Sequence, residues 1–181
     1  MGTELLHHKL GRAFAQMDVD GKGKIKRDDL LGLGARILIG FGESPTSPTG
    51  SRLVHGFESL WQTLSAEIGA DGDGSISPQE FQAGMISAFG DGDRSDPVLR
   101  SVAEAIGALC DADGDGAVGP AEFRVMLTAF GTAHDDVDAA FDRLDRDHDG
   151  SIPVGELIEA VRQYYTSTDP NATGNWLFGP L

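Results

Sequence analysis

The sequence predicts an all-α fold of four helix–loop–helix units that pack in two pairs. Four acidic loops recur along the 181 residues. Each loop contains a turn glycine: Gly23, Gly74, Gly116 and Gly150. Each also lies between two segments whose apolar residues recur every three or four positions, which is the period of an amphipathic helix. A β-branched residue follows each glycine by two positions, so we expect a short antiparallel β bridge between the loops of each pair.

Two expected helices flank the first loop. Residues 3–17 place four apolar side chains on one helical face: Leu6, Leu10, Phe14 and Met17. His7 and His8 fall on or near the solvated face, where a metal-binding role is the less favoured interpretation. The second helix carries Leu30, Leu33 and Ile37 and ends near residues 40–42. Residues 43–50 are rich in Pro, Ser and Thr, which predicts a linker.

The second unit has an impaired loop. Its entering helix is expected at residues 51–68, with an apolar stripe of Leu53, Phe57, Leu60, Leu64 and Ile68. The loop must end at Glu80, which places Gly69 at the first ligand position. Because glycine supplies no carboxylate, we expect this loop to bind metal weakly or not at all. Residues 77–80 still form a helix start, with Ser77 as the cap and Glu80 reaching back.

The third and fourth units follow an expected hinge at residues 90–94. Asp96 and Pro97 open the next helix as cap and first residue. The core-facing positions of that helix are Val98, Val102, Ala105, Ile106 and Leu109. The helix after the third loop carries Phe123, Met126, Leu127 and Phe130. The fourth unit continues this pattern with Val137, Ala140, Phe141 and Leu144 before its loop, and Leu157, Ile158, Val161 and Tyr164 after it.

Residues 111–122 form the most regular of the loops. Asp111, Asp113 and Asp115 alternate, so their carboxylates can converge on one hard cation. Ala117 offers a backbone carbonyl, and Glu122 can close the shell with both carboxylate oxygens. This spacing matches the Ca²⁺ loop of EF-hand proteins. Residues 145–156 repeat it, with expected ligands at Asp145, Asp147, Asp149, Ser151 and Glu156. Val118 and Ile152 are expected to pair across the two loops.

The first loop, residues 18–29, departs from this pattern. Its expected ligands are Asp18, Asp20, the backbone carbonyl of Lys24, and Asp29. Lys22 stands where a third oxygen is expected, and its ammonium cannot coordinate a cation. Asp29 is one methylene shorter than the usual closing glutamate, so the loop favours a smaller site in which Mg²⁺ competes with Ca²⁺. We expect metal here, but with lower affinity than in the last two loops.

Composition excludes several classes of partner. The formal charge is −15, which argues against nucleic acid and against anionic membrane surfaces. The single cysteine, Cys110, is expected in the core, and its isolation fits a reducing cytoplasm. No signal peptide is visible, so we expect a cytoplasmic protein, and we expect it to be monomeric. No set of nucleophile, base and orienting group appears, so the sequence does not indicate an enzyme.

The C-terminal residues 169–181 are unusually apolar for a chain end. Trp176, Leu177 and Phe178 are consecutive, and Leu181 ends the chain. Exposed, such a cluster would be an interaction or aggregation patch. We expect this segment to fold back and fill a groove between two lobes, residues 1–90 and residues 91–168.

Taken together, the chain resembles the sarcoplasmic type of EF-hand calcium-binding protein. The features that carry the resemblance are loops one, three and four, the long first connection, and the tail Gly-Asn-Trp-Leu-Phe-Gly, which is similar to bacterial calerythrin-like members. The resemblance implies a compact protein with two EF-hand pairs and three bound Ca²⁺ ions. Lys22 and Asp29 depart from the family pattern at the first loop.

Three functions compete at this point. The first is a Ca²⁺ buffer or transporter. The second is a Ca²⁺ sensor that opens a groove for a target protein; against it, the chain has only four methionines and so lacks an adaptable Met-rich surface. The third is a photoprotein-like protein that encloses a small apolar ligand, which the 7% aromatic content does not favour.

Overall fold

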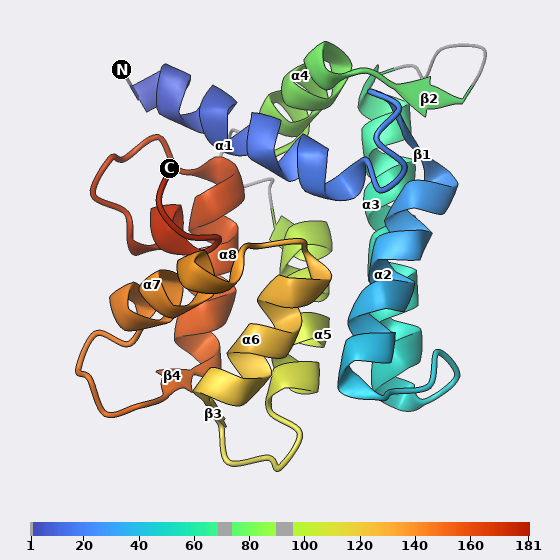
Figure 1. Cartoon of the computed structure of the whole chain (residues 1–181). Helices are drawn as coiled ribbons and strands as arrows, with labels where there is room; N and C mark the ends of the chain where they lie inside the picture. Colours follow the sequence, from blue (N-terminus) through green and yellow to red (C-terminus); the bar gives the residue numbers. More distant parts are fainter. Residues whose placement is uncertain (1, 69–73, 90–95) are drawn as a thin grey trace.

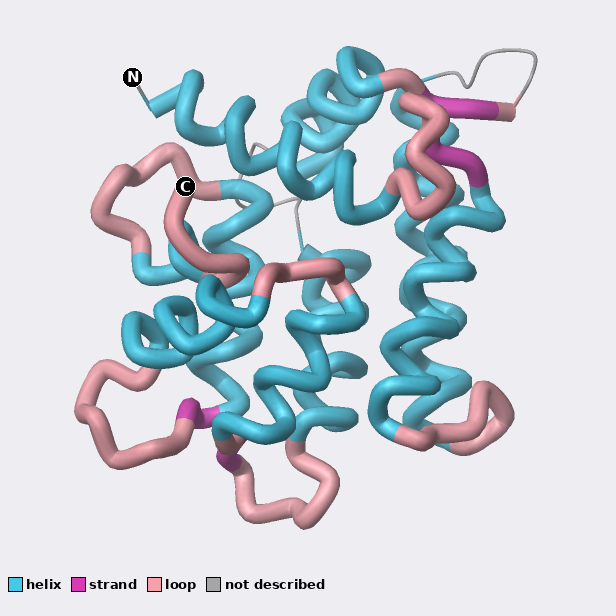
Figure 2. Tube along the Cα trace, in the orientation of Figure 1, coloured by secondary structure: helices cyan, strands magenta, loops and turns pink. Residues whose placement is uncertain are grey.

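The computed structural model describes residues 2–68, 74–89 and 96–181 (Figure 1). The described residues form eight α-helices, one 3₁₀ helix and four two-residue strands. The α-helices are α1 (Gly2–Met17), α2 (Arg27–Phe41), α3 (Pro48–Ile68), α4 (Pro78–Phe89), α5 (Asp96–Cys110), α6 (Pro120–Ala129), α7 (His134–Leu144) and α8 (Val154–Thr166). The helical content is plain in Figure 2, where strands are confined to the ends of the loops. The predicted all-α class is confirmed.

The strands pair the loops as expected. β1 (Ile25–Lys26) is antiparallel to β2 (Ser75–Ile76), and β3 (Ala117–Val118) is antiparallel to β4 (Ile152–Pro153). Ile25 lies opposite Ile76, and Val118 lies opposite Ile152. All four of these side chains are buried. Hands one and two therefore form one pair, and hands three and four form the other.

The linker between the first two hands is shorter than the sequence indicated. α3 begins at Pro48 rather than at residue 51, because Ser47 caps the helix: its Oγ accepts a hydrogen bond from the amide of Gly50 at 3.0 Å. α2 ends where Gly42 adopts a φ of 66°, and its amide bonds back to the carbonyl of Ile39. The chain thus turns from α2 into α3 within a few residues.

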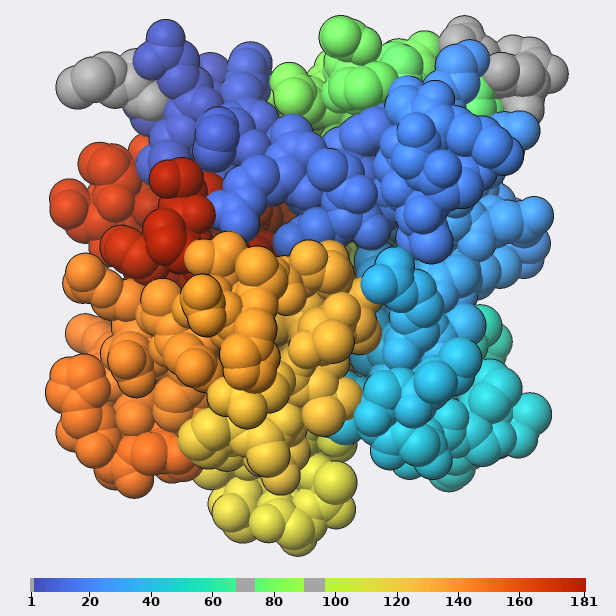
Figure 3. Space-filling view, in the orientation of Figure 1, coloured from blue at the N-terminus to red at the C-terminus, as the bar shows by residue number. Residues whose placement is uncertain are grey.

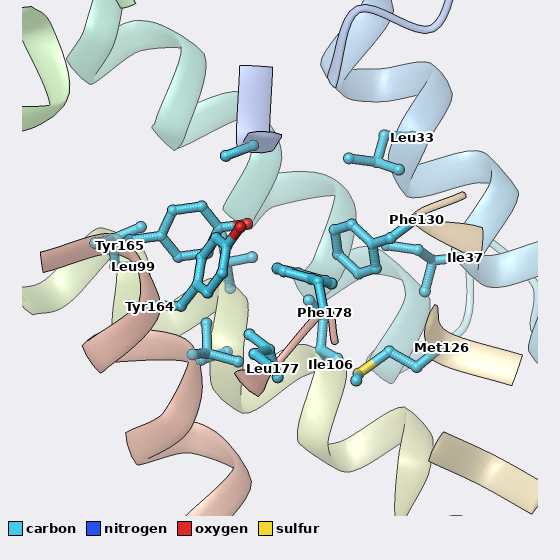
Figure 4. Close-up of a cluster of buried hydrophobic side chains, with 14 of the residues drawn as sticks. Leu33, Ile37, Leu99, Ile106, Met126, Phe130, Tyr164, Tyr165, Leu177 and Phe178 are labelled. Atoms are coloured by element: carbon cyan, nitrogen blue, oxygen red, sulfur yellow. The ribbon is translucent and has the colours of Figure 1, made fainter. Parts of the chain in front are cut away.

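The two halves share a continuous apolar core. α3 packs on α5, and α2 packs on α6. Glycines sit at both contacts: a Cβ on Gly56 would lie 3.0 Å from a Val102 methyl, and one on Gly40 would lie 3.1 Å from a Val125 methyl. These positions let the helices of the two halves approach closely. Figure 4 shows part of the cluster where they meet, including Ile37, Ile106 and Met126.

The C-terminal segment, residues 169–181, folds back onto the molecule through η1 (Thr173–Trp176). η1 packs against α7 and α8, and Figure 3 shows the segment in red between α1 above and α7 below. Leu177 and Phe178 are buried, as a packed tail requires. Trp176 is only half-buried, with the Arg143 guanidinium 4.4 Å from its ring centre, and Leu181 is 44% exposed. The tail therefore buries two of its four large apolar residues fully.

None of the helices in the described ranges has both the length and the hydropathy needed to cross a bilayer.

Candidate metal centre

Loop three brings together the three aspartates that the sequence singled out. A carboxylate oxygen from each of Asp111, Asp113 and Asp115 lies within 4.8 Å of the others. The loop's own amides hold them: Gly116 donates to Asp111 at 3.1 Å, and Ala117 donates to Asp115 at 2.9 Å. Gly116 has a φ of 83°, which is the left-handed turn that glycine permits. The three carboxylates therefore form a compact acidic cluster, which suits a hard cation.

Loop four forms a second cluster of three aspartate carboxylates. A carboxylate oxygen from each of Asp145, Asp147 and Asp149 lies within 4.8 Å of the others, and Gly150 donates to Asp145 Oδ2 at 3.0 Å. Asp145 is only 5% exposed, and its Oδ1 is buried with no hydrogen-bond donor in the described part of the chain. A buried carboxylate oxygen without a partner is costly, and a bound cation would supply that partner. The residues present therefore fit a divalent metal.

The closing glutamates lie outside these two groups of aspartates. The Glu122 carboxylate lies beside Gly119, where an added Cβ would be 2.7 Å from Glu122 Oε2. Glu156 is exposed, at the start of α8. Coordination by these two carboxylates remains a prediction, as does coordination by the carbonyls of Ala117 and Ser151.

Loop one has the same backbone arrangement but a different charge pattern. Gly23 donates to Asp18 at 2.7 Å, and Lys26 donates to Asp29 at 2.8 Å. However, the Lys22 ammonium lies 2.9 Å from Asp20, and this hydrogen bond lowers the pKa of Asp20. The described residues of this loop do not form a group of three convergent carboxylates. Metal binding through Asp18, Asp20, Lys24 and Asp29 therefore stays a prediction.

The first five positions of loop two, residues 69–73, lie outside the described residues, and the expected first ligand position, Gly69, is among them. Its end is described and agrees with the sequence. Glu80 accepts a hydrogen bond from the amide of Ser77 at 2.8 Å, and Ser77 Oγ accepts one from the amide of Glu80 at 3.3 Å. This reciprocal cap confirms the predicted helix start.

Comparison with known proteins agrees with this geometry. The EF-hand family model matches residues 10–31, 70–86 and 137–161, which cover hands one, two and four. A solved structure of a Streptomyces coelicolor calcium-binding protein is 35% identical, covers 89% of this chain and 98% of its own, and superposes with a TM-score of 0.75. The chain belongs to the EF-hand family of calcium-binding proteins. As an EF-hand protein it takes Ca²⁺ as its ligand, and the aspartates of loops three and four are the groups suited to hold it.

Two further relatives place this EF-hand protein within the family. Calerythrin of Saccharopolyspora erythraea is 29% identical over 167 residues, which is 91% of this chain and 94% of the relative. The photoprotein clytin is 21% identical, covers 97% of this chain and 93% of its own, and has a TM-score of 0.76. The likeness to clytin shows a shared fold. The predicted resemblance to calerythrin is confirmed.

Two cations of the first helix, Lys9 and Arg12, have contacts that the sequence pattern did not predict. Lys9 is fully buried, and Arg12 reaches the C-terminal segment. The available signal was the position of Lys9, three residues after Leu6 on the apolar face of α1. Cys110, in contrast, is buried as expected, and burial raises the pKa of its thiol to about 12, so it carries no thiolate.

Proposed function

We propose that this protein binds Ca²⁺ tightly in loops three and four and more weakly in loop one, and that it acts as a calcium buffer. The single observation that supports the proposed Ca²⁺ sites is the pair of convergent aspartate groups in loops three and four. One of these groups contains Asp145 Oδ1, which has no hydrogen-bond donor among the described residues. Loop one ranks lower because Lys22 pairs with Asp20. Its shorter closing residue, Asp29, makes it the loop where Mg²⁺ competes.

The buffer role is supported by the closed core. A sensor needs an apolar groove that calcium makes available, whereas a buffer needs none. Here Leu177 and Phe178 help to line the central cavity, whose volume is about 30 Å³. That volume holds about one water molecule. It also gives no support to a photoprotein-like role, in which a small apolar ligand would have to fit inside.

A sensor is the second candidate function. It is favoured by the Streptomyces coelicolor relative, to which prokaryotic calcium-mediated regulation is attributed. In that case calcium would have to displace the C-terminal segment. The two functions therefore differ in one property, which is the exposure of apolar surface when calcium binds.

A hydrophobic dye separates the two. The full chain is titrated with Ca²⁺ in the presence of the dye, and a variant lacking residues 169–181 serves as the open control. A buffer predicts little change in dye fluorescence for the full chain and a strong signal for the truncated variant. Strong, calcium-dependent dye binding by the full chain would make the sensor the better account.

We further propose that the chain is divided into two EF-hand pairs and a closing C-terminal segment. Residues 1–90 and 91–168 form the two EF-hand pairs, and residues 169–181 close the space between them. The −15 charge and the closed core support a monomer that has no nucleic-acid partner. The isolated, buried Cys110 fits a cytoplasmic location.

A further inference from the structure

The first helix holds the C-terminal segment through a buried ammonium group. Lys9 is 0% exposed, yet its Nζ makes three hydrogen bonds. It donates to the carbonyl of Gln163 at 3.1 Å, to the carbonyl of Ser167 at 2.8 Å and to Asn175 Oδ1 at 2.8 Å. All three acceptors are neutral, so these hydrogen bonds offset the charge without a paired carboxylate. Two of the acceptors are carbonyls at the C-terminal end of α8, where the helix dipole favours a cation.

The third acceptor is held in place by the segment itself. Asn175 donates through Nδ2 to the carbonyl of Asp169 at 2.9 Å and to that of Pro170 at 3.1 Å. Because the amide nitrogen is committed to these carbonyls, the amide oxygen faces Lys9. The Tyr164 hydroxyl also donates to the carbonyl of Lys9 at 3.4 Å. The start of the C-terminal segment is therefore held in place by hydrogen bonds that lead, through Asn175, to the Lys9 ammonium group.

A second cation holds the other end of the segment. Arg12 lies about one turn after Lys9 on α1 and donates to the carbonyl of Phe178 at 2.9 Å and to that of Pro180 at 2.7 Å. α1 thus contacts the segment at residue 175 and again at residues 178–180. These residues are separated from α1 by more than 160 positions in the chain.

Between the two contacts lie the side chains that close the core. Leu177 and Phe178 line the central cavity together with Met17, the last residue of α1. The Phe178 ring centre lies 5.2 Å from that of Phe130 and 4.8 Å from that of Tyr164. Figure 4 shows Phe178 directed into this cluster. If the segment left, the cavity would open to solvent.

We propose that Lys9 and Arg12 form a latch through which the first helix holds the C-terminal segment over the central cavity. The latch makes closure depend on α1, which runs directly into loop one at Asp18. The N-terminal hand and the C-terminal end of the chain are therefore coupled through one helix. A movement of α1 away from α8 breaks both contacts together and releases Leu177 and Phe178.

Substitution to methionine tests the latch, since it keeps an unbranched apolar side chain at each position and removes the charge and the donors. The full chain is prepared as Lys9→Met, as Arg12→Met and as the double variant. Arg52→Met, which alters an exposed residue of α3, is the matched control. Amide hydrogen exchange is followed at Leu177 and Gly179, whose N–H groups donate to the carbonyls of Gly174 and Trp176.

The latch predicts exchange at these two amides at least tenfold faster in the double variant, with smaller increases in the single variants. Protection in α5 and α6 should be unchanged, and dye binding should rise toward the level of the truncated chain. Unchanged exchange at the two amides would overturn the proposal. Loss of protection throughout the double variant would point to general unfolding. In that case the single variant Arg12→Met is the deciding measurement, because Arg12 is partly exposed and its loss should not unfold the protein. Unchanged exchange at the two amides in Arg12→Met would overturn the latch.

Discussion

Lys9 is a charged residue on the apolar, core-facing side of α1, where the helical pattern predicts an apolar one. Its neighbours on the inner face of α1 are apolar, and burial lowers the pKa of its ammonium to about 8. The groups that face it are the carbonyls and Asn175 described above, the Tyr164 ring at 5.8 Å, and Arg12 one turn along α1. The pKa of Tyr164 is itself raised to about 12 by burial, so this phenol does not titrate alongside Lys9.

The lowered pKa predicts how the stability contribution of Lys9 varies with pH. Between about pH 8 and the ordinary lysine value of 10.5, the unfolded chain holds this proton and the folded chain has lost it. Stability therefore rises with pH in this window, by at most about 1.4 kcal/mol per pH unit from this group. We expect the free energy of unfolding of the native chain, relative to Lys9→Met, to increase between pH 7.5 and pH 10. A constant difference in denaturant titrations would show that the pKa of Lys9 is ordinary.

Gly174 is a second residue whose neighbours fix its identity. A Cβ there would collide with the carbonyl oxygen of Ala160 and would lie 2.6 Å from the Cβ of Gln163. We expect Gly174→Ala to destabilise the fold by roughly 1–3 kcal/mol, since α8 and the tail would have to separate. Gly155 is the matched control, because a Cβ there meets nothing within 4 Å and Gly155→Ala should stabilise α8 by about 0.5–1 kcal/mol. Equal melting temperatures for the two variants would contradict this account.

At the scale of elements, the paired loops are the units that the sequence predicts best. The spacing of Asp111, Asp113 and Asp115 reflects local geometry alone. The β bridge that places Val118 opposite Ile152 joins two loops, and the repeat of a β-branched residue two positions after each turn glycine predicts it. The start of α3 was less predictable, because the cap formed by Ser47 competes with a linker composition. The contacts of Lys9 could not be predicted, since they join residues more than 150 positions apart through side-chain hydrogen bonds.

The β3–β4 bridge predicts coupling between the last two loops. An ion in one loop orders the bridge and lowers the cost of ordering the other loop. We expect Glu122→Gln to weaken Ca²⁺ binding in loop four, although the substitution lies in loop three, by roughly fivefold or more. Glu67→Gln removes the same charge from an exposed position on α3 and should have little effect. Calorimetry that finds loop four unaffected by Glu122→Gln would rule the coupling out.

For the molecule as a whole, the sequence predicts the fold class and the candidate metal ligands better than it predicts how the C-terminal segment covers the core. Hydrophobic periodicity places the eight helices because their buried faces repeat locally. The tail is different: Trp176 and Leu181 look as apolar as Phe178 in the sequence, yet only Phe178 of these three is fully buried. Which tail residues enter the core depends on the carbonyl contacts of Arg12 and on the turn at Gly179, where φ is 90°.

The close contacts between the halves support a molecule that binds calcium without opening. Gly40 and Gly56 bring α2 against α6 and α3 against α5, and η1 of the C-terminal segment packs against α7 and α8. Packed interfaces of this kind resist gradual separation. Calcium affinity would then be set within the loops and not by a large rearrangement of the helices.

A calorimetric Ca²⁺ titration of the full chain, with and without Mg²⁺, tests the central claim most directly. We predict two tightly bound ions in loops three and four, and a third, weaker ion in loop one that Mg²⁺ displaces. Glu122→Gln and Glu156→Gln should each weaken the tight phase and leave the third ion in place. A chain that binds no calcium tightly, or whose tight phase survives both substitutions, would contradict the account.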